Sequence, residues 1–171
     1  GNPKHKKTYK ENVLNGEETL FYENGKPQLQ NHYINGKKNG ETTYFDENGN
    51  RTKIEHFKDD MKDGIEHIIS DNSLVEENHY TDSVLNGVTK KYNKEYQTDE
   101  IEYADGKKNG IARHFNKDGS TTEVPYVNDQ KNGTGIAYYP DKKIANKAEY
   151  RNDAKNGMSL KYYKNGKRQL A

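Results

Sequence analysis

The sequence predicts an all-β fold, an elongated single-layer antiparallel meander of about seven tandem β-hairpin repeats. Two periodic features carry this prediction. Aromatic residues recur every 23 or 24 residues along the 171-residue chain, and a glycine stands seven residues after each of them. Glycine also follows Asn or Asp at 13 of its 15 positions, and such dipeptides favour the tight turns of β-hairpins.

Three columns define the repeat. The first aromatic column consists of Tyr9, Tyr33, Phe57, Tyr80, Tyr103, Tyr126 and Tyr150. The glycine column consists of Gly16, Gly40, Gly64, Gly87, Gly110, Gly133 and Gly157. A second column, twelve residues after the first, consists of Phe21, Phe45, Ile69, Tyr92, Phe115, Tyr138 and Tyr162. We expect both large columns to share one buried face, and the glycine to leave room for a neighbouring ring.

Each repeat is expected to form one hairpin. In the second repeat the strands should cover residues 40–45 and 53–57, with a type I′ turn at residues 46–50 and a crossover at residues 35–40. The fourth repeat has Asn93-Lys94-Glu95 in place of Asn-Gly, which predicts a distorted or longer turn. The chain then divides into an N-terminal basic tail at residues 1–8 and a repeat array at residues 9–171, with repeats starting at residues 9, 33, 57, 80, 103, 126 and 150.

Composition excludes several classes of protein. Only 29% of residues are hydrophobic and mean hydropathy is -1.40, but 14 Tyr and 4 Phe at regular spacing argue against disorder. A net charge of +1 gives no bias toward nucleic acid, which we do not expect as a partner. The absence of cysteine excludes disulfides, thiolate metal sites and cysteine nucleophiles.

The sequence leaves the compartment open. No apolar run approaches the ~20 residues that a transmembrane helix needs. The chain begins at Gly1 and not at Met, so we expect either export after trimming of a signal or anchor segment, or a cytoplasmic protein.

No motif indicates catalysis, a cofactor or a metal. His32, His56 and His79 occupy the same repeat position, but equivalent positions in successive hairpins are about 9.5 Å apart, too far to share one ion. The adjacent carboxylate pairs Glu17-Glu18, Asp59-Asp60 and Glu76-Glu77 face opposite sides of a strand, so we interpret them as solvated charges.

Three segments carry a family resemblance: YINGKKNG at residues 33–40, YADGKKNG at 103–110 and YRNDAKNG at 150–157. This pattern resembles the bacterial variant of the MORN repeat, and the likeness extends from residue 9 to residue 168. The resemblance implies a single-layer antiparallel sheet and a bacterial protein of the antitoxin or immunity type. Eukaryotic relatives imply membrane attachment, phospholipid contact or scaffolding.

Together these features predict a non-catalytic module that binds a protein partner. The alternative is a membrane-surface or cell-envelope scaffold that binds anionic lipid through its basic C-terminal repeats. Two groups are candidate partner contacts: the tyrosines Tyr22, Tyr139 and Tyr163, and the carboxylates Asp59, Asp60 and Asp63. The tyrosines should lie on the face opposite the aromatic core, and the carboxylates should attract a basic partner. The competing interpretation is that the tyrosines cover the back of the sheet and the carboxylates confer solubility.

Overall fold

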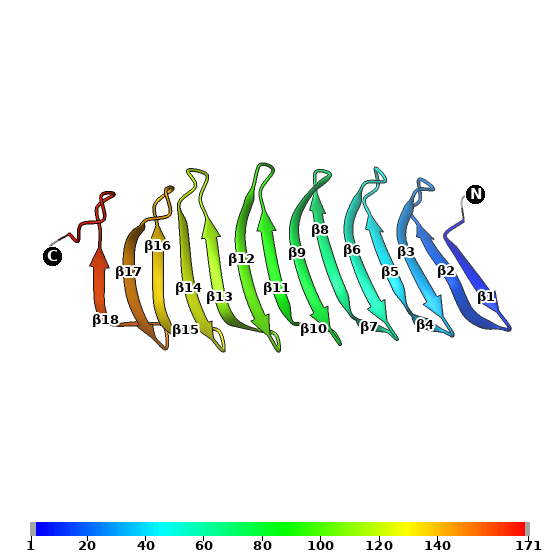
Figure 1. Ribbon diagram of the computed structural model, residues 1–171. Coiled ribbons are helices and arrows are strands. Elements are labelled where there is room, and N and C mark those ends of the chain that lie inside the picture. The colour runs from blue at the N-terminus through cyan, green and yellow to red at the C-terminus, as the bar shows by residue number, and fades with distance from the viewer. Residues whose placement is uncertain (1–2, 170–171) are drawn as a thin grey trace. The chain divides into compact units, whose positions relative to one another are not determined.

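The computed structural model describes residues 3–169, and within them the chain forms 18 β-strands and no helix. Two units divide the chain, the first ending at Val84 and the second starting at Leu85. Within each unit the strands pair antiparallel in sequence order, so each unit is an open single-layer meander, as predicted (Figure 1).

The first unit contains three complete hairpins and an additional N-terminal strand. Its strands are β1 (His5–Lys10), β2 (Val13–Phe21), β3 (Pro27–Ile34), β4 (Lys37–Lys38), β5 (Gly40–Phe45), β6 (Arg51–Lys58), β7 (Met61–Lys62), β8 (Gly64–Ser70) and β9 (Ser73–Thr81). The predicted strand at residues 40–45 is confirmed, and β6 contains the one predicted at residues 53–57. Residues 5–8 belong to β1, which pairs with β2.

The second unit repeats the same plan. The two-residue strand β10 (Val84–Leu85) leads into it, followed by β11 (Gly87–Tyr92), β12 (Gln97–Ala104), β13 (Lys107–Phe115), β14 (Thr121–Val127), β15 (Gln130–Lys131), β16 (Gly133–Tyr138), β17 (Ile144–Arg151) and β18 (Ala154–Lys161). The short strands β4, β7, β10 and β15 lie in the predicted crossovers, which are therefore tight turns themselves.

Type I′ turns are expected at the hairpin tips, but most of them lie in the crossovers instead. A type I′ turn needs positive φ at both central residues. Asn35 and Gly36 meet this condition with φ of 51° and 82°, and Asp59 and Asp60 meet it with 49° and 71°. At the tip that follows β5, only Gly49 has positive φ, as in a type I turn followed by a left-handed glycine.

The fourth tip is one residue shorter than the second and the fifth, so of the two predicted alternatives, a distorted or a longer turn, the longer turn is wrong. Tyr92 pairs with Gln97, whereas Phe45 in the second repeat pairs with Arg51. The Oδ1 atom of Asn93 closes this loop by accepting the backbone N–H groups of Glu95 and Tyr96 at 2.8 and 3.0 Å. An Asn side chain thus closes this tip, where the second and fifth tips have the left-handed glycines Gly49 and Gly119.

The two large columns lie on opposite faces of the sheet, so the expectation of one shared face is wrong. Phe115 and Arg113 are two residues apart on β13 and therefore lie on the same face. Arg113 pairs with Glu123 on β14, so Glu123 lies on that face too. Tyr126 is three residues after Glu123 on the same strand, so it lies on the opposite face. The reason is the crossover turn, across which Tyr33 pairs with Lys38, five residues later. Residues that pair directly lie on the same face, so Lys38 shares the face of Tyr33. Phe45 lies seven residues after Lys38, an odd number, and therefore lies on the opposite face.

We call the face that carries the first aromatic column the tyrosine face. In the first unit it carries Tyr33, Phe57 and Tyr80, and in the second unit Tyr103, Tyr126 and Tyr150. The opposite face, which carries Glu17, His32 and Glu41 in the first unit and Arg113, Phe115 and Tyr138 in the second, is the groove face.

Most of the buried side chains in each unit form a row along the middle of the tyrosine face, and the aromatic rings beside it are only half-buried. Thr19 and Thr43, on the groove face of the first unit, are buried as well. In the first unit this row is polar: Glu18, Asn31, Thr42, Glu55, Glu66 and Asn78. In the second unit the same positions are small or apolar: Thr89, Ile101, Ala112, Val124, Gly135 and Ala148. The predicted aromatic core is thus corrected to a row of buried polar groups in one unit and a thin apolar row in the other.

Candidate functional site

The polar row contains two buried carboxylates on neighbouring strands. Glu55 on β6 is 3% exposed and Glu66 on β8 is 5% exposed. The Nζ atom of Lys62 lies 2.7 Å from Oε1 of Glu55 and 2.8 Å from Oε1 of Glu66. Lys53 and the hydroxyl of Tyr44 also contact Glu55, and Asn78 donates to Glu66. Every oxygen of this carboxylate pair therefore has a partner within the chain.

These contacts govern the ionisation of the group. Burial opposes the charge on Glu55, but hydrogen bonds from Lys62, Tyr44 and Lys53 outweigh it and lower the pKa of Glu55 to about 2. Burial, together with the hydrogen bond to Glu55, raises the pKa of Tyr44 to about 12. The carboxylate pKa is thus displaced away from neutrality, as expected of a structural ion network and not of an acid-base catalyst.

A second network surrounds Glu18 on β2. Its Oε2 atom accepts a hydrogen bond from Asn31 at 2.7 Å, and its Oε1 atom lies 2.9 Å from His5 and 3.4 Å from Lys7. Burial opposes ionisation, but these hydrogen bonds lower the pKa of Glu18. Thr42 extends the network by donating to Oδ1 of Asn31 at 3.1 Å. The interpretation of Glu18 as a solvated charge is therefore wrong, because its side chain is buried and paired.

The crossovers are joined from one repeat to the next by side chains at the second turn position. Oδ1 of Asp60 accepts the backbone N–H of Lys38 at 2.7 Å, and Ser83 accepts that of Lys62 at 2.9 Å. Asp129 and Asp153 do the same for Lys108 and Lys131 at 2.8 and 2.9 Å. Replacing the crossover glycine by Asp or Ser thus adds a hydrogen bond between repeats.

The hydrogen bonds between successive crossovers involve one of the acidic residues that are predicted to contact a partner. Asp60 uses one carboxylate oxygen within the chain, whereas Asp59 is exposed beside it. Asp63 lies near the next crossover, with Oδ2 at 3.5 Å from the N–H of Asp82. Of these three carboxylates, Asp59 remains the most available to a partner.

The predicted contact tyrosines lie at the hairpin tips. The hydroxyl of Tyr22 donates to the carbonyl of Phe45, and that of Tyr139 donates to the carbonyl of Tyr162, both at 2.7 Å. Each bond therefore joins one hairpin to the next. Tyr163 occupies the same repeat position but is 54% exposed, and its hydroxyl has no hydrogen bond within residues 3–169.

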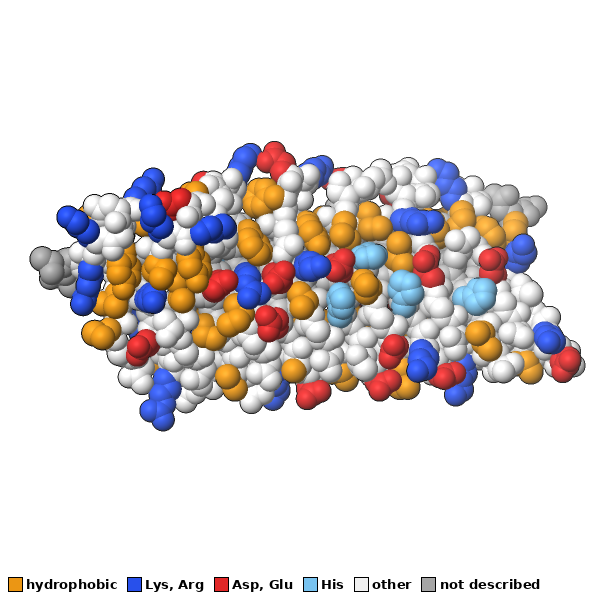
Figure 2. Space-filling model, in the orientation of Figure 1, with side chains coloured by type: hydrophobic (Ala, Val, Ile, Leu, Met, Phe, Trp, Pro, Cys, Tyr) orange, Lys and Arg blue, Asp and Glu red, His pale blue; other side chains and the backbone are white. Residues whose placement is uncertain are grey.

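Histidine side chains gather over the first unit (Figure 2). His56 contacts the carbonyl of Ile65 at 2.8 Å, and His67 and His79 each lie 3.5 Å from the carboxylate of Glu77. No group of three or more His, Asp or Glu residues in the described part of the chain could hold a metal ion.

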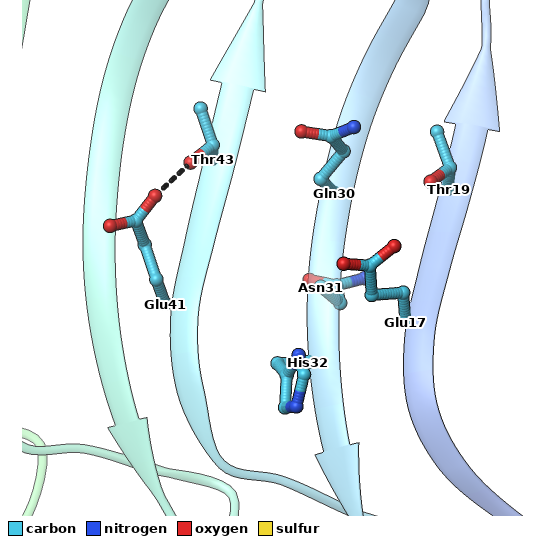
Figure 3. A pocket seen from close by; sticks show the side chains of 7 residues that line it. All are labelled: Glu17, Thr19, Gln30, Asn31, His32, Glu41 and Thr43. Atoms are coloured by element: carbon cyan, nitrogen blue, oxygen red, sulfur yellow. Dashed lines mark hydrogen bonds between the residues drawn. The ribbon is translucent and has the colours of Figure 1, made fainter. Parts of the chain in front are cut away.

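A polar groove of about 190 Å³ crosses β2, β3 and β5 on the groove face of the first unit (Figure 3). It is lined by Glu17, Thr19, Gln30, Asn31, His32, Glu41 and Thr43. The residues form two rows because Glu17 pairs with His32, Thr19 with Gln30 and Gln30 with Thr43. The floor is buried, since Thr19 and Thr43 are only 8% and 4% exposed.

A larger hollow of about 530 Å³ lies between the fourth and fifth hairpin tips in the second unit. Its walls include the half-buried rings of Tyr96 and Phe115, and an exposed ion pair between Lys117 and Glu95 at 2.8 Å lies at its rim. Hydrophobic side chains also gather over the last strands of the second unit (Figure 2).

Arg113 sits at the centre of the groove face of the second unit. Its guanidinium lies 2.8 Å from Glu100 and 3.1 Å from Glu123, which in turn accepts the hydroxyl of Tyr138 at 3.2 Å. Burial opposes the charge on Arg113, but these carboxylates raise its pKa. The arginine is therefore committed to internal contacts.

Sequence reasoning missed both the groove and the hollow. Tyr96 stands outside the two aromatic columns, and the irregular fourth turn was the one signal that pointed to it. Glu17 and Glu41 occupy the position after the column glycine, where charge is expected on any solvated strand.

The comparison with protein families agrees with this geometry. Residues 14–35, 38–59 and 131–152 match the model of the MORN repeat variant. Each matched segment covers one hairpin, β2–β3, β5–β6 or β16–β17. These three hairpins are therefore similar to MORN repeats of the variant type. No curated protein matches the chain. Within the described residues, no helix is long and apolar enough to cross a membrane.

Proposed function

We propose that this repeat module is a non-catalytic protein-binding module, and that the hollow beside Tyr96 and Phe115 receives the partner. The observation that carries the proposal is the presence of two half-exposed aromatic rings in a hollow of about 530 Å³, next to charged residues at its rim. Aromatic anchors in a pocket with a polar rim are typical of the centre of protein interfaces.

The tyrosine face offers less to a partner. In the first unit its buried carboxylates and amides are already hydrogen-bonded to each other. These buried groups are therefore not free to form hydrogen bonds with a partner. In the first unit, the groove face therefore offers a partner more unpaired polar groups than the tyrosine face does.

Affinity capture with the tagged chain tests the proposal. Tyr96→Ser should lower the amount of a stoichiometric partner at least tenfold, since interface anchors contribute about 2 kcal/mol or more. Tyr9→Ser is the matched control, because this tyrosine is 57% exposed but lies on β1 in the first unit and does not line the hollow. Equal capture by the wild type and by Tyr96→Ser would refute the assignment of the hollow.

The more specific form of the proposal, an antitoxin or immunity-type protein, is supported by the family resemblance and predicts that the captured partner loses its activity in the complex. The alternative, a membrane-surface or envelope scaffold, predicts flotation with anionic vesicles in the absence of any protein partner.

A further inference from the structure

We infer that the polar groove of the first unit binds an arginine side chain of a protein partner. The inference rests on the proposed function, because it assumes a protein ligand, but it concerns a different unit from the aromatic hollow. It is carried by the groove's charge, by its unpartnered polar groups and by its buried floor.

The charge of the groove is negative and is not neutralised within the chain. Glu17 has no ion pair or hydrogen bond among the described residues, in contrast with Glu18 beside it, which has four hydrogen-bonding neighbours. Glu41 accepts one hydrogen bond, from the hydroxyl of Thr43 at 2.7 Å, which leaves its second oxygen open. A cationic ligand would supply the charge that both carboxylates lack.

The groove contains polar groups that have no hydrogen-bond partner among residues 3–169, one at its floor and one that is exposed. Thr19 lines the groove and is only 8% exposed. Its hydroxyl has no hydrogen-bond partner in residues 3–169. Gln30, beside it on β3, has an amide group without a partner in the same range. Both groups face the groove, so the N–H groups of a bound cation can replace water at the Thr19 hydroxyl and at the amide oxygen of Gln30.

The geometry favours a guanidinium over an ammonium group. Glu17 and Glu41 stand on strands separated by β3, so their backbones are roughly 9.6 Å apart, with the imidazole of His32 between them. Figure 3 shows the carboxylate of Glu17 leaning from β2 toward β3, at a level between Gln30 and His32 on that strand. A planar guanidinium has five donors and stacks on rings, so one group can reach Glu17 and Gln30 while lying over His32. A lysine would offer a single point charge to one carboxylate.

The test uses a defined probe: an acetylated and amidated Gly-Ser nonapeptide with one central arginine. Binding is followed by NMR of the full chain, through the side-chain amide of Gln30 and the ring of His32. The arginine peptide should shift both signals in a saturable way, the matched lysine peptide should bind at least threefold more weakly, and a citrulline peptide, which is nearly isosteric but neutral, should not bind.

Variants of the chain complete the test. Glu17→Gln is exposed and keeps the shape of the side chain, so it should fold normally and weaken arginine binding about tenfold. Thr19→Val should weaken binding severalfold. Glu47→Gln, an exposed carboxylate at a hairpin tip, should leave it unchanged. Equal binding of the lysine or citrulline peptide, absence of a saturable shift, or unchanged binding by Glu17→Gln would each overturn the inference. None of these results would change the capture of a protein partner through Tyr96. A failure of arginine binding in the groove is therefore distinguishable from a failure of the proposed function.

Discussion

Glu55 and Glu66, two buried carboxylates on the neighbouring strands β6 and β8, both contact the ammonium group of Lys62, at 2.7 and 2.8 Å. Their strands are in register, because Ile54 pairs with His67 one position earlier. Like charges directly opposite each other in a sheet repel, so Lys62 is what makes this pairing possible. The first unit depends on this network, in a row where the second unit uses small or apolar residues.

Lys62→Met is expected to destabilise the chain by about 3 to 5 kcal/mol, because it leaves two buried carboxylates without their shared cation. Lys58→Met, an exposed lysine on the same strand as Glu55, should change the free energy of unfolding by less than about 0.5 kcal/mol. Urea unfolding measures both. The triple variant Glu55→Val, Glu66→Ala and Lys62→Met removes both carboxylates together with their cation and should recover most of the loss. A loss below about 1 kcal/mol in Lys62→Met would contradict the role given to this network.

Acid should destabilise the chain through Glu55. The pKa of Glu55 in the folded state is about 2, against an ordinary value of 4.5. Because the folded pKa is the lower one, this carboxylate stabilises the fold fully above pH 4.5, and its contribution is lost as pH falls from 4.5 to 2. Urea midpoints measured across this window should fall more steeply in the wild type than in Glu55→Gln. Parallel pH curves for the two proteins would show that Glu55 is not the titrating group.

Gly110 tests what the glycine column does. Its φ is +125°, and an added Cβ would lie 2.8 Å from the Cβ of Glu102, the residue before the column aromatic and not the ring itself. Gly110→Ala should therefore cost about 2 to 4 kcal/mol, from positive-φ strain and overpacking together. Gly166 has φ of +82° and nothing within 4 Å, so Gly166→Ala should show the strain alone, about 1 kcal/mol. Thermal unfolding compares them, and equal losses would remove the steric part of the explanation.

Tyr139→Phe should cost about 0.5 to 1.5 kcal/mol, because it removes the hydroxyl that donates to the carbonyl of Tyr162. Tyr163→Phe removes a hydroxyl with no partner in the described residues and should leave stability unchanged. Denaturant unfolding of the two single variants makes the comparison. If both substitutions had the same effect, the hydrogen bond between hairpins would contribute nothing to stability.

The sequence predicted the period, the antiparallel hairpins and the strand at residues 40–45, because turn chemistry and aromatic spacing are local signals. It could not predict the faces. Counting twelve residues from Tyr33 to Phe45 ignores the crossover turn, which changes the alternation. The polar row of the first unit could not be predicted from the sequence, for another reason. Glu17 and Glu18 look alike in the sequence, and only strand pairing shows that Glu18 meets Asn31 while Glu17 faces the groove.

The most direct test of the account is photo-crosslinking from two adjacent positions on β13. Phe115 lines the hollow on the groove face, and His114, exposed beside it, points to the tyrosine face. A photoreactive amino acid at position 115 should give one discrete crosslinked partner in cells that produce the protein, and the same amino acid at position 114 should give none. A discrete partner at position 114 alone, or no adduct at either position, would contradict binding through the groove face.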